Sequence, residues 1–153
     1  MTIGVNERYP AVKAKGEFKN RMRRANEVLF LVGSKMTLEQ LQKDSYRIAN
    51  AHGFYDDIPE EAKTDSTFLG SRLMLMVSEF AEALEEIRAG VDPRLIYYNT
   101  NKPDKPEGFI IELADAIIRV ADTAEWLGLD LAHAIKIKQE YNESREYKHG
   151  KTI

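Results

Sequence analysis

The sequence predicts an all-α protein, an antiparallel bundle of four to five helices, and three observations lead to this prediction. Apolar residues recur every three to four positions along several long segments, as on one face of a helix. Residues that favour helix ends stand at the borders of these segments. No segment shows the apolar–polar alternation of a half-buried strand. Helices with one apolar face bury it against one another, which favours a bundle.

In chain order, the expected helices are residues 17–32, 37–52, 65–89, 106–127 and 130–145. The second begins with a capping box, because Thr37 is followed three residues later by Gln40. Gly53, Gly90 and Gly128 stand where the second, third and fourth helices should end. The two central helices are expected to line the core with the following residues: Leu69, Leu73, Met76, Phe80, Leu84 and Ile87 on one, and Phe109, Leu113, Ala116, Val120 and Leu127 on the other.

The composition is that of a soluble globular protein, with 43% hydrophobic and 31% charged residues in a chain of 153. No apolar run has the length of a membrane span, and the N-terminus lacks the apolar region of a secretory signal. The chain has no cysteine, which excludes disulfides, thiolate zinc sites and a cysteine nucleophile. We therefore expect a cytoplasmic protein.

Charge divides the chain into two predicted parts. Residues 1–36 form a basic arm, which includes the first expected helix and has eight Lys and Arg against three Asp and Glu. Residues 37–153 form the helical domain and have fourteen against twenty-two. The arm could bind nucleic acid, solubilise the chain or dock on an acidic neighbouring subunit. Nucleic acid is disfavoured because Arg21, Arg23 and Arg24 lack the interleaved aromatics that stack on bases.

Two pairs of carboxylates indicate a site. Glu79 and Glu82 are one helical turn apart, and so are Glu112 and Asp115, so each pair projects from one face of its helix. Such pairs are also common on solvated helices, but here both border an apolar stripe, where a purely solvating charge would not be placed. If the two helices pack together, four carboxylates converge. Hard oxygen ligands at this density suit Mg²⁺ or Mn²⁺.

A di-iron centre is the rival prediction for a helical bundle, but it requires Glu-x-x-His motifs, which are absent here. The last helix and the tail instead carry cations and an amide, which suit an anion such as a phosphate. These residues are Lys138, Asn142, Arg145, Lys148 and Lys151.

The motifs together, over residues 37–152, resemble those of the MazG-like all-α nucleoside triphosphate pyrophosphohydrolases, relatives of dimeric dUTPases and phosphoribosyl-ATP pyrophosphatases. The chain departs from the family pattern at Ser78, where the first glutamate usually stands, and its gap between Glu82 and Glu112 is long. The three motifs are Ser78-Glu79-x-x-Glu82, Glu112-x-x-Asp115-x-x-x-Arg119 and Lys138-x-x-x-Asn142-x-x-Arg145-x-Tyr147-Lys148-His149-Gly150-Lys151.

The resemblance implies hydrolysis of a nucleoside triphosphate to a monophosphate and pyrophosphate with Mg²⁺ or Mn²⁺, on deoxynucleotides and among these dGTP-like purines. It implies a homodimer or homotetramer in the cytoplasm of a bacterium, encoded by the bacterium or a phage. The implied roles are metal binding by Glu79, Glu82, Glu112 and Asp115, general base catalysis by Glu79 or Glu82, phosphate binding by Lys138, Asn142, Arg145, Lys148 and Lys151, and base recognition by Asn50, Phe68 and Trp126.

The alternative is a non-catalytic helical module that binds nucleic acid or a protein partner through the basic arm. The serine at position 78 and the charge of residues 1–36 favour this alternative.

Overall fold

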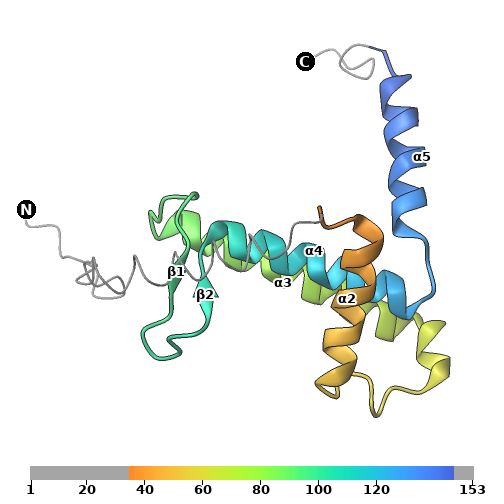
Figure 1. The fold of residues 1–153 in the computed structure, drawn as a ribbon, viewed down its shortest axis with the longest axis horizontal. Coiled ribbons are helices and arrows are strands. Elements are labelled where there is room, and N and C mark those ends of the chain that lie inside the picture. The colour runs from red at the N-terminus through yellow and green to blue at the C-terminus, as the bar shows by residue number, and fades with distance from the viewer. Residues whose placement is uncertain (1–34, 147–153) are drawn as a thin grey trace, which may run out of the picture. The chain divides into compact units, whose positions relative to one another are not determined.

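A computed structural model of the chain describes residues 35–146, which are mostly helical (Figure 1). Within this range four α-helices pack together beside a small two-stranded hairpin. The expected helix 17–32, and with it nearly all of the basic arm, lies outside the described residues. The elements are α2 (Leu38–Ala51), the 3₁₀ helix η1 (Glu60–Lys63), α3 (Ser66–Arg88), β1 (Tyr97–Tyr98), β2 (Pro106–Glu107), α4 (Phe109–Trp126) and α5 (Leu131–Glu143).

Side-chain caps begin three of the helices where the sequence predicts them. The Thr37 hydroxyl accepts a hydrogen bond from the backbone N–H of Gln40 at 3.1 Å. Asp65 and Asp130 cap α3 and α5 in the same way. Each cap satisfies a backbone donor that the first helical turn leaves without a partner. The predicted limits of these helices are therefore confirmed to within a few residues.

The expectation that the chain contains no strand is wrong. Tyr97 and Tyr98 pair antiparallel with Glu107 and Pro106, so the residues before α4 form a hairpin instead of its first turn. Gly108 then separates the hairpin from the helix, with a φ of 125° that favours glycine. A Cβ at this position would lie 2.4 Å from the carbonyl oxygen of Leu95. The fourth helix consequently begins at Phe109 and not near Pro106.

The core lies around Tyr55, Ala62 and Trp126, where α2, η1, α3 and α4 meet. α2 packs on α4, and α3 runs antiparallel to α4. The buried amide of Gln42 joins α2 to the end of α4 and the start of α5: its Nε2 donates to Glu125 and to the carbonyl of Leu129, at 2.7 and 2.8 Å.

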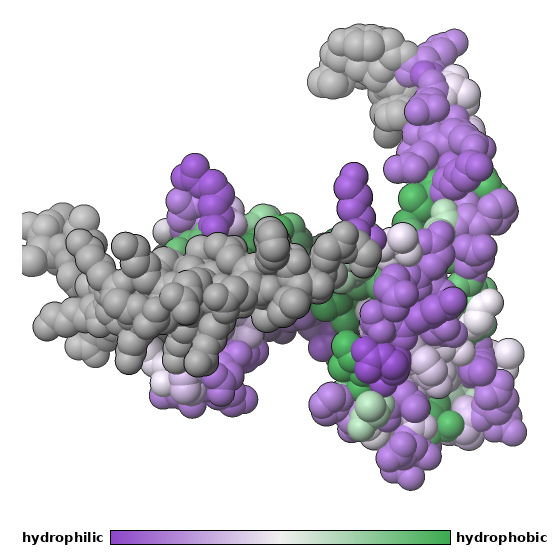
Figure 2. Space-filling model, viewed as in Figure 1, coloured by the Kyte–Doolittle hydropathy of each residue, from purple (hydrophilic) through white to green (hydrophobic). Residues whose placement is uncertain are grey.

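The predicted core stripe of α3 is largely exposed in the single chain, so the expectation is wrong for four of its six residues. The predicted stripe of α4 is buried or partly buried at every position except Val120, so there the expectation is largely confirmed. Leu73 and Phe80 are 58% and 55% exposed. α3 faces α4 with Glu79 and Ala83, about 100° around the helix from that stripe. Exposed apolar side chains also occur on α5, where Figure 2 shows hydrophobic patches among polar residues.

None of the helices among residues 35–146 is both long enough and apolar enough to cross a membrane.

Candidate metal site on α3 and α4

Three glutamates from the two central helices converge. Glu79 and Glu82 come from successive turns of α3, and Glu112 comes from the first turn of α4. Each offers a carboxylate oxygen, and these oxygens all lie within 4.8 Å of one another. Glu79 and Glu112 are buried, at 5% and 4% exposure, whereas Glu82 is exposed. The site therefore has two buried carboxylates and one at its mouth. We call these three residues the acidic cluster.

Among the described residues, Glu112 is the buried member of the acidic cluster that has no charged partner, whereas Glu82 lacks one as well but is exposed. Within residues 35–146 the Glu112 carboxylate accepts no hydrogen bond and forms no ion pair. Burial, together with the neighbouring charges of Glu82 and Asp115, raises the pKa of Glu112 to about 7. A buried carboxylate without a partner is costly when charged, and a bound cation would remove that cost.

Glu79 has a partner of its own. Its Oε1 accepts a hydrogen bond from the Nε of Arg119 at 2.5 Å, and the two form an ion pair. Arg119 lies on α4 one turn beyond Asp115, and it is 43% exposed at its side chain. The sequence motif contains Arg119, but its contact with Glu79 is not among the sequence predictions. Its i, i+4 spacing from Asp115 is the signal that places it on the face of the acidic residues.

Asp115 lies beside the acidic cluster but is not one of the three residues that converge. Burial raises the pKa of Asp115, the charge of Glu79 raises it as well, and Arg119 lowers it. The structure thus brings three of the four predicted metal ligands together and leaves the fourth as a close neighbour.

A hairpin residue that sequence reasoning missed also lies near the acidic cluster. Lys105 forms an ion pair with Glu107 at 3.0 Å. The bond to Glu107 raises the pKa of the Lys105 ammonium, and the charges of Glu112 and Glu82 raise it too. The hairpin segment that contains Lys105 has no helical periodicity. Only its position in the sequence, just before the helix of Glu112, indicates that Lys105 could lie near the site.

The predicted phosphate-binding residues of α5 are not brought to the acidic cluster. Lys138 and Asn142 are exposed, and the cations of Lys138 and Arg145 lie over the ring of Tyr141, at 4.8 and 5.7 Å from its centroid. α5 packs against α2. No hydrogen bond or ion pair of the described residues joins these side chains to the three glutamates. Lys148 and Lys151 lie outside the described residues.

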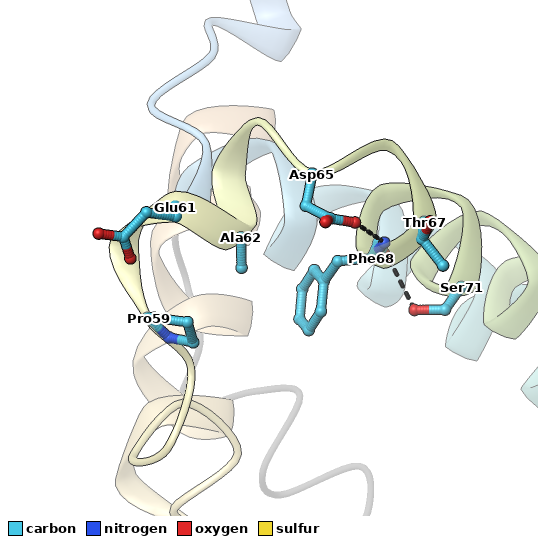
Figure 3. Close-up of a pocket in the computed structure, with 7 residues that line it drawn as sticks. All are labelled: Pro59, Glu61, Ala62, Asp65, Thr67, Phe68 and Ser71. Carbon is cyan, nitrogen blue, oxygen red and sulfur yellow. Dashed lines mark hydrogen bonds between the residues drawn. The ribbon is translucent and has the colours of Figure 1, made fainter.

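Two of the three residues predicted to recognise the base contact each other. The rings of Phe68 and Trp126 pack with centroids 5.5 Å apart, and Trp126 is buried in the core. Asn50 is exposed near the end of α2. Phe68 also borders an open pocket of about 670 Å³, and Figure 3 shows its ring between Ala62 and Ser71 in that view. The pocket is lined by Pro59, Glu61, Ala62, Asp65, Thr67, Phe68 and Ser71.

A second charged network connects α3 and α4 nearer to the core. Arg72 donates to Asp122 at 2.5 Å and to the hydroxyl of Tyr55 at 2.7 Å, and Tyr55 donates to Asp122 at 2.6 Å. The Arg72 guanidinium also lies 5.3 Å from the centroid of the Trp126 ring. Burial and the bond to Asp122 raise the pKa of Tyr55, so its hydroxyl remains a donor. This network was not predicted, because it pairs residues fifty positions apart.

No protein-family model, no curated protein and no solved structure matches this chain. Three carboxylates at this separation can hold one divalent cation through oxygen ligands, and the exposed edge at Glu82 leaves room for a further ligand and for water.

Proposed function

We propose that the chain is a MazG-like nucleoside triphosphate pyrophosphohydrolase that uses Mg²⁺ or Mn²⁺ and acts on deoxynucleotides. One observation carries the proposal: the acidic cluster places three carboxylate oxygens within 4.8 Å, and one of them, on buried Glu112, has no partner among residues 35–146. Oxygen-only ligation suits a hard cation, and such cations commonly accompany phosphates.

Glu79, Glu82 and Glu112 would hold the cation, and Asp115 would complete the set from the next turn of α4. The bound cation supplies charge neutralisation at the phosphate oxygens and acidifies water. Glu79 is already oriented by Arg119, so Glu82 is the better candidate for the general base. Its exposed carboxylate would take a proton from the water whose oxygen bonds to the α-phosphorus. The bond from that phosphorus to the departing pyrophosphate breaks.

Incubating the protein with each canonical deoxynucleoside and ribonucleoside triphosphate in Mg²⁺ should give the monophosphate and pyrophosphate in equal amounts. Ion-exchange chromatography separates these products from diphosphate and orthophosphate. Formation of diphosphate, or an absence of turnover with the whole panel, would contradict the proposal. If the protein also failed to take up Mn²⁺ in calorimetry, the non-catalytic helical module would be favoured. The same panel measures the preference for purine deoxynucleotides that the family resemblance implies.

We also propose that the enzyme is a homodimer or a dimer of such dimers, in which a second copy covers the exposed stripe of α3. This stripe consists of Leu73, Val77, Phe80, Leu84 and Ile87, all between 43% and 58% exposed. Monomeric proteins commonly expose single apolar residues, but this stripe forms a contiguous apolar surface along most of a helix. The same stripe on a second copy of the chain can pack against it and remove both from water.

Replacing Phe80 with Glu should then convert the protein to a monomer, because a charge would be desolvated at the centre of the interface. Light scattering after size-exclusion chromatography measures the mass. Phe54→Glu is the matched control, since Phe54 is 72% exposed in a loop outside the stripe. We expect the dissociation constant of the dimer to rise by about 100-fold or more for Phe80→Glu and to stay unchanged for Phe54→Glu. A monomeric wild-type protein would refute this arrangement.

A further inference from the structure

The hairpin between α3 and α4 is attached at both sides of the acidic cluster. The hydroxyl of Tyr97 donates to Glu86 at 2.8 Å, and Glu86 is one turn beyond Glu82 on α3. On the other side, β2 leads through Gly108 into α4, and the Gly108 carbonyl accepts the N–H of Glu112 at 3.2 Å. The hairpin therefore spans the end of the cluster, held to the helix of Glu82 and to that of Glu112.

Within this hairpin, Lys105 has a defined position. Oε1 of Glu107 accepts the amide N–H of Asn99 at 2.9 Å and contacts the Lys105 ammonium at 3.0 Å. The side chain of Glu107 is only 13% exposed, whereas that of Lys105 is 50% exposed. Two backbone hydrogen bonds close the loop that carries Lys105. The N–H of Asn99 donates to the carbonyl of Lys105 at 3.1 Å, and the N–H of Lys105 donates to the carbonyl of Lys102 at 2.9 Å.

This arrangement differs from a lysine that only neutralises a cluster of acids. Such a lysine would form its ion pairs with the cluster itself and would be buried with it. Lys105 instead forms its ion pair with Glu107, outside the cluster, and half of its side chain is accessible. It is close enough for the charges of Glu82 and Glu112 to act on it. A fixed, accessible ammonium beside a divalent-cation site is suited to an anion that binds both.

We propose that Lys105 contacts the phosphate chain of a ligand bound at the acidic cluster, with Glu107 holding its ammonium toward the site. The ligand class is a polyphosphate or the phosphates of a nucleoside triphosphate. This inference rests on the proposed function, since it requires the cation at the three glutamates. It also supplies, within the described residues, a phosphate-binding cation that α5 does not bring to the cluster.

The test measures two affinities of the full-length chain. Paramagnetic resonance follows the binding of Mn²⁺ alone, and calorimetry follows the binding of inorganic tripolyphosphate in saturating Mg²⁺, which makes the result independent of the base. Lys105→Gln should weaken tripolyphosphate binding about 10-fold, since it removes one charge-assisted contact. Lys105→Arg should retain most of the affinity. Lys102→Gln is the matched control, because it removes the same charge from the same loop, and it should change the affinity less than about twofold.

Binding of Mn²⁺ alone should be unchanged or tighter in Lys105→Gln, because a positive charge near three carboxylates is removed. If Lys105→Gln bound tripolyphosphate as tightly as the wild type, Lys105 would be a charge-balancing residue and the inference would be wrong, with the proposed function unaffected. An equal loss in Lys102→Gln would also overturn it, since the effect would then be general charge. If the wild type failed to bind Mn²⁺, both the proposed function and this inference would be refuted.

Discussion

Replacing Glu112 with Gln should lower kcat/KM for triphosphate hydrolysis by about 100-fold or more, the largest effect we expect from one substitution. Gln keeps the shape of the side chain but removes the charge from the one buried, unpartnered carboxylate of the acidic cluster. Glu82→Gln should cause a similar loss, since it removes a ligand and the candidate general base. Steady-state kinetics with Mg²⁺ and the preferred nucleotide measure both, and the affinity for Mn²⁺ should fall in parallel.

The control is Glu85→Gln, which removes one carboxylate from the same helix at a position that is exposed and paired with Arg88. Circular dichroism should give equal helix content for all these variants. Full activity in Glu112→Gln would show that Glu112 is not a ligand. Equal losses in Glu85→Gln would show that overall negative charge, and not the acidic cluster, supports the reaction.

The second large effect concerns the stability of the metal-free protein. The pKa of Glu112 is about 7 in the folded chain, against an ordinary value of 4.5. The folded state therefore holds a proton that the unfolded state has released, and stability falls as pH rises from about 4.5 to about 7. With a chelator present to remove metal ions, the free energy of unfolding of Glu112→Gln should equal that of the wild type below this pH window. Above it, the variant should be more stable by on the order of 2–3 kcal/mol, since it keeps a neutral side chain at the buried position.

Chemical denaturation at several pH values between 4.5 and 8 measures this difference. Excess Mg²⁺ should reverse the order above pH 7, because the cation stabilises only the folded protein that binds it. Comparing the two proteins at each pH cancels the titration of the groups that do not interact with Glu112. A difference that does not vary with pH would mean that Glu112 is ionised throughout the window, and the account of its burial would be wrong.

The parts of the fold that depend on neighbouring residues were predictable. Thr37, Asp65 and Asp130 cap their helices through bonds that span three residues, so each signal is complete within one short segment. The convergence of Glu79, Glu82 and Glu112 required only two such local spacings and the assumption that α3 packs on α4.

The parts that depend on which surfaces meet were not predictable in this way. The period of a helix indicates that Leu73 and Phe80 share an apolar stripe, but it does not tell which surface covers that stripe. Both were expected in the core of the chain and are exposed. The Lys105 hairpin has too few residues in strands to show alternation, and the partnership of Arg72 with Asp122 depends on tertiary contact alone.

That last pair sets the axial offset of the two helices. Arg72 lies seven residues before Glu79 on α3, and Asp122 lies seven residues after Asp115 on α4, so each is two turns from the acidic turns and on the same face. Sliding one helix by a single turn, about 5.4 Å, would place Asp122 against Phe68 or Met76 and leave a buried charge unpaired. The ion pair near the core thus fixes which turns of α3 and α4 stand opposite each other, and with them the spacing of carboxylates about 10 Å away.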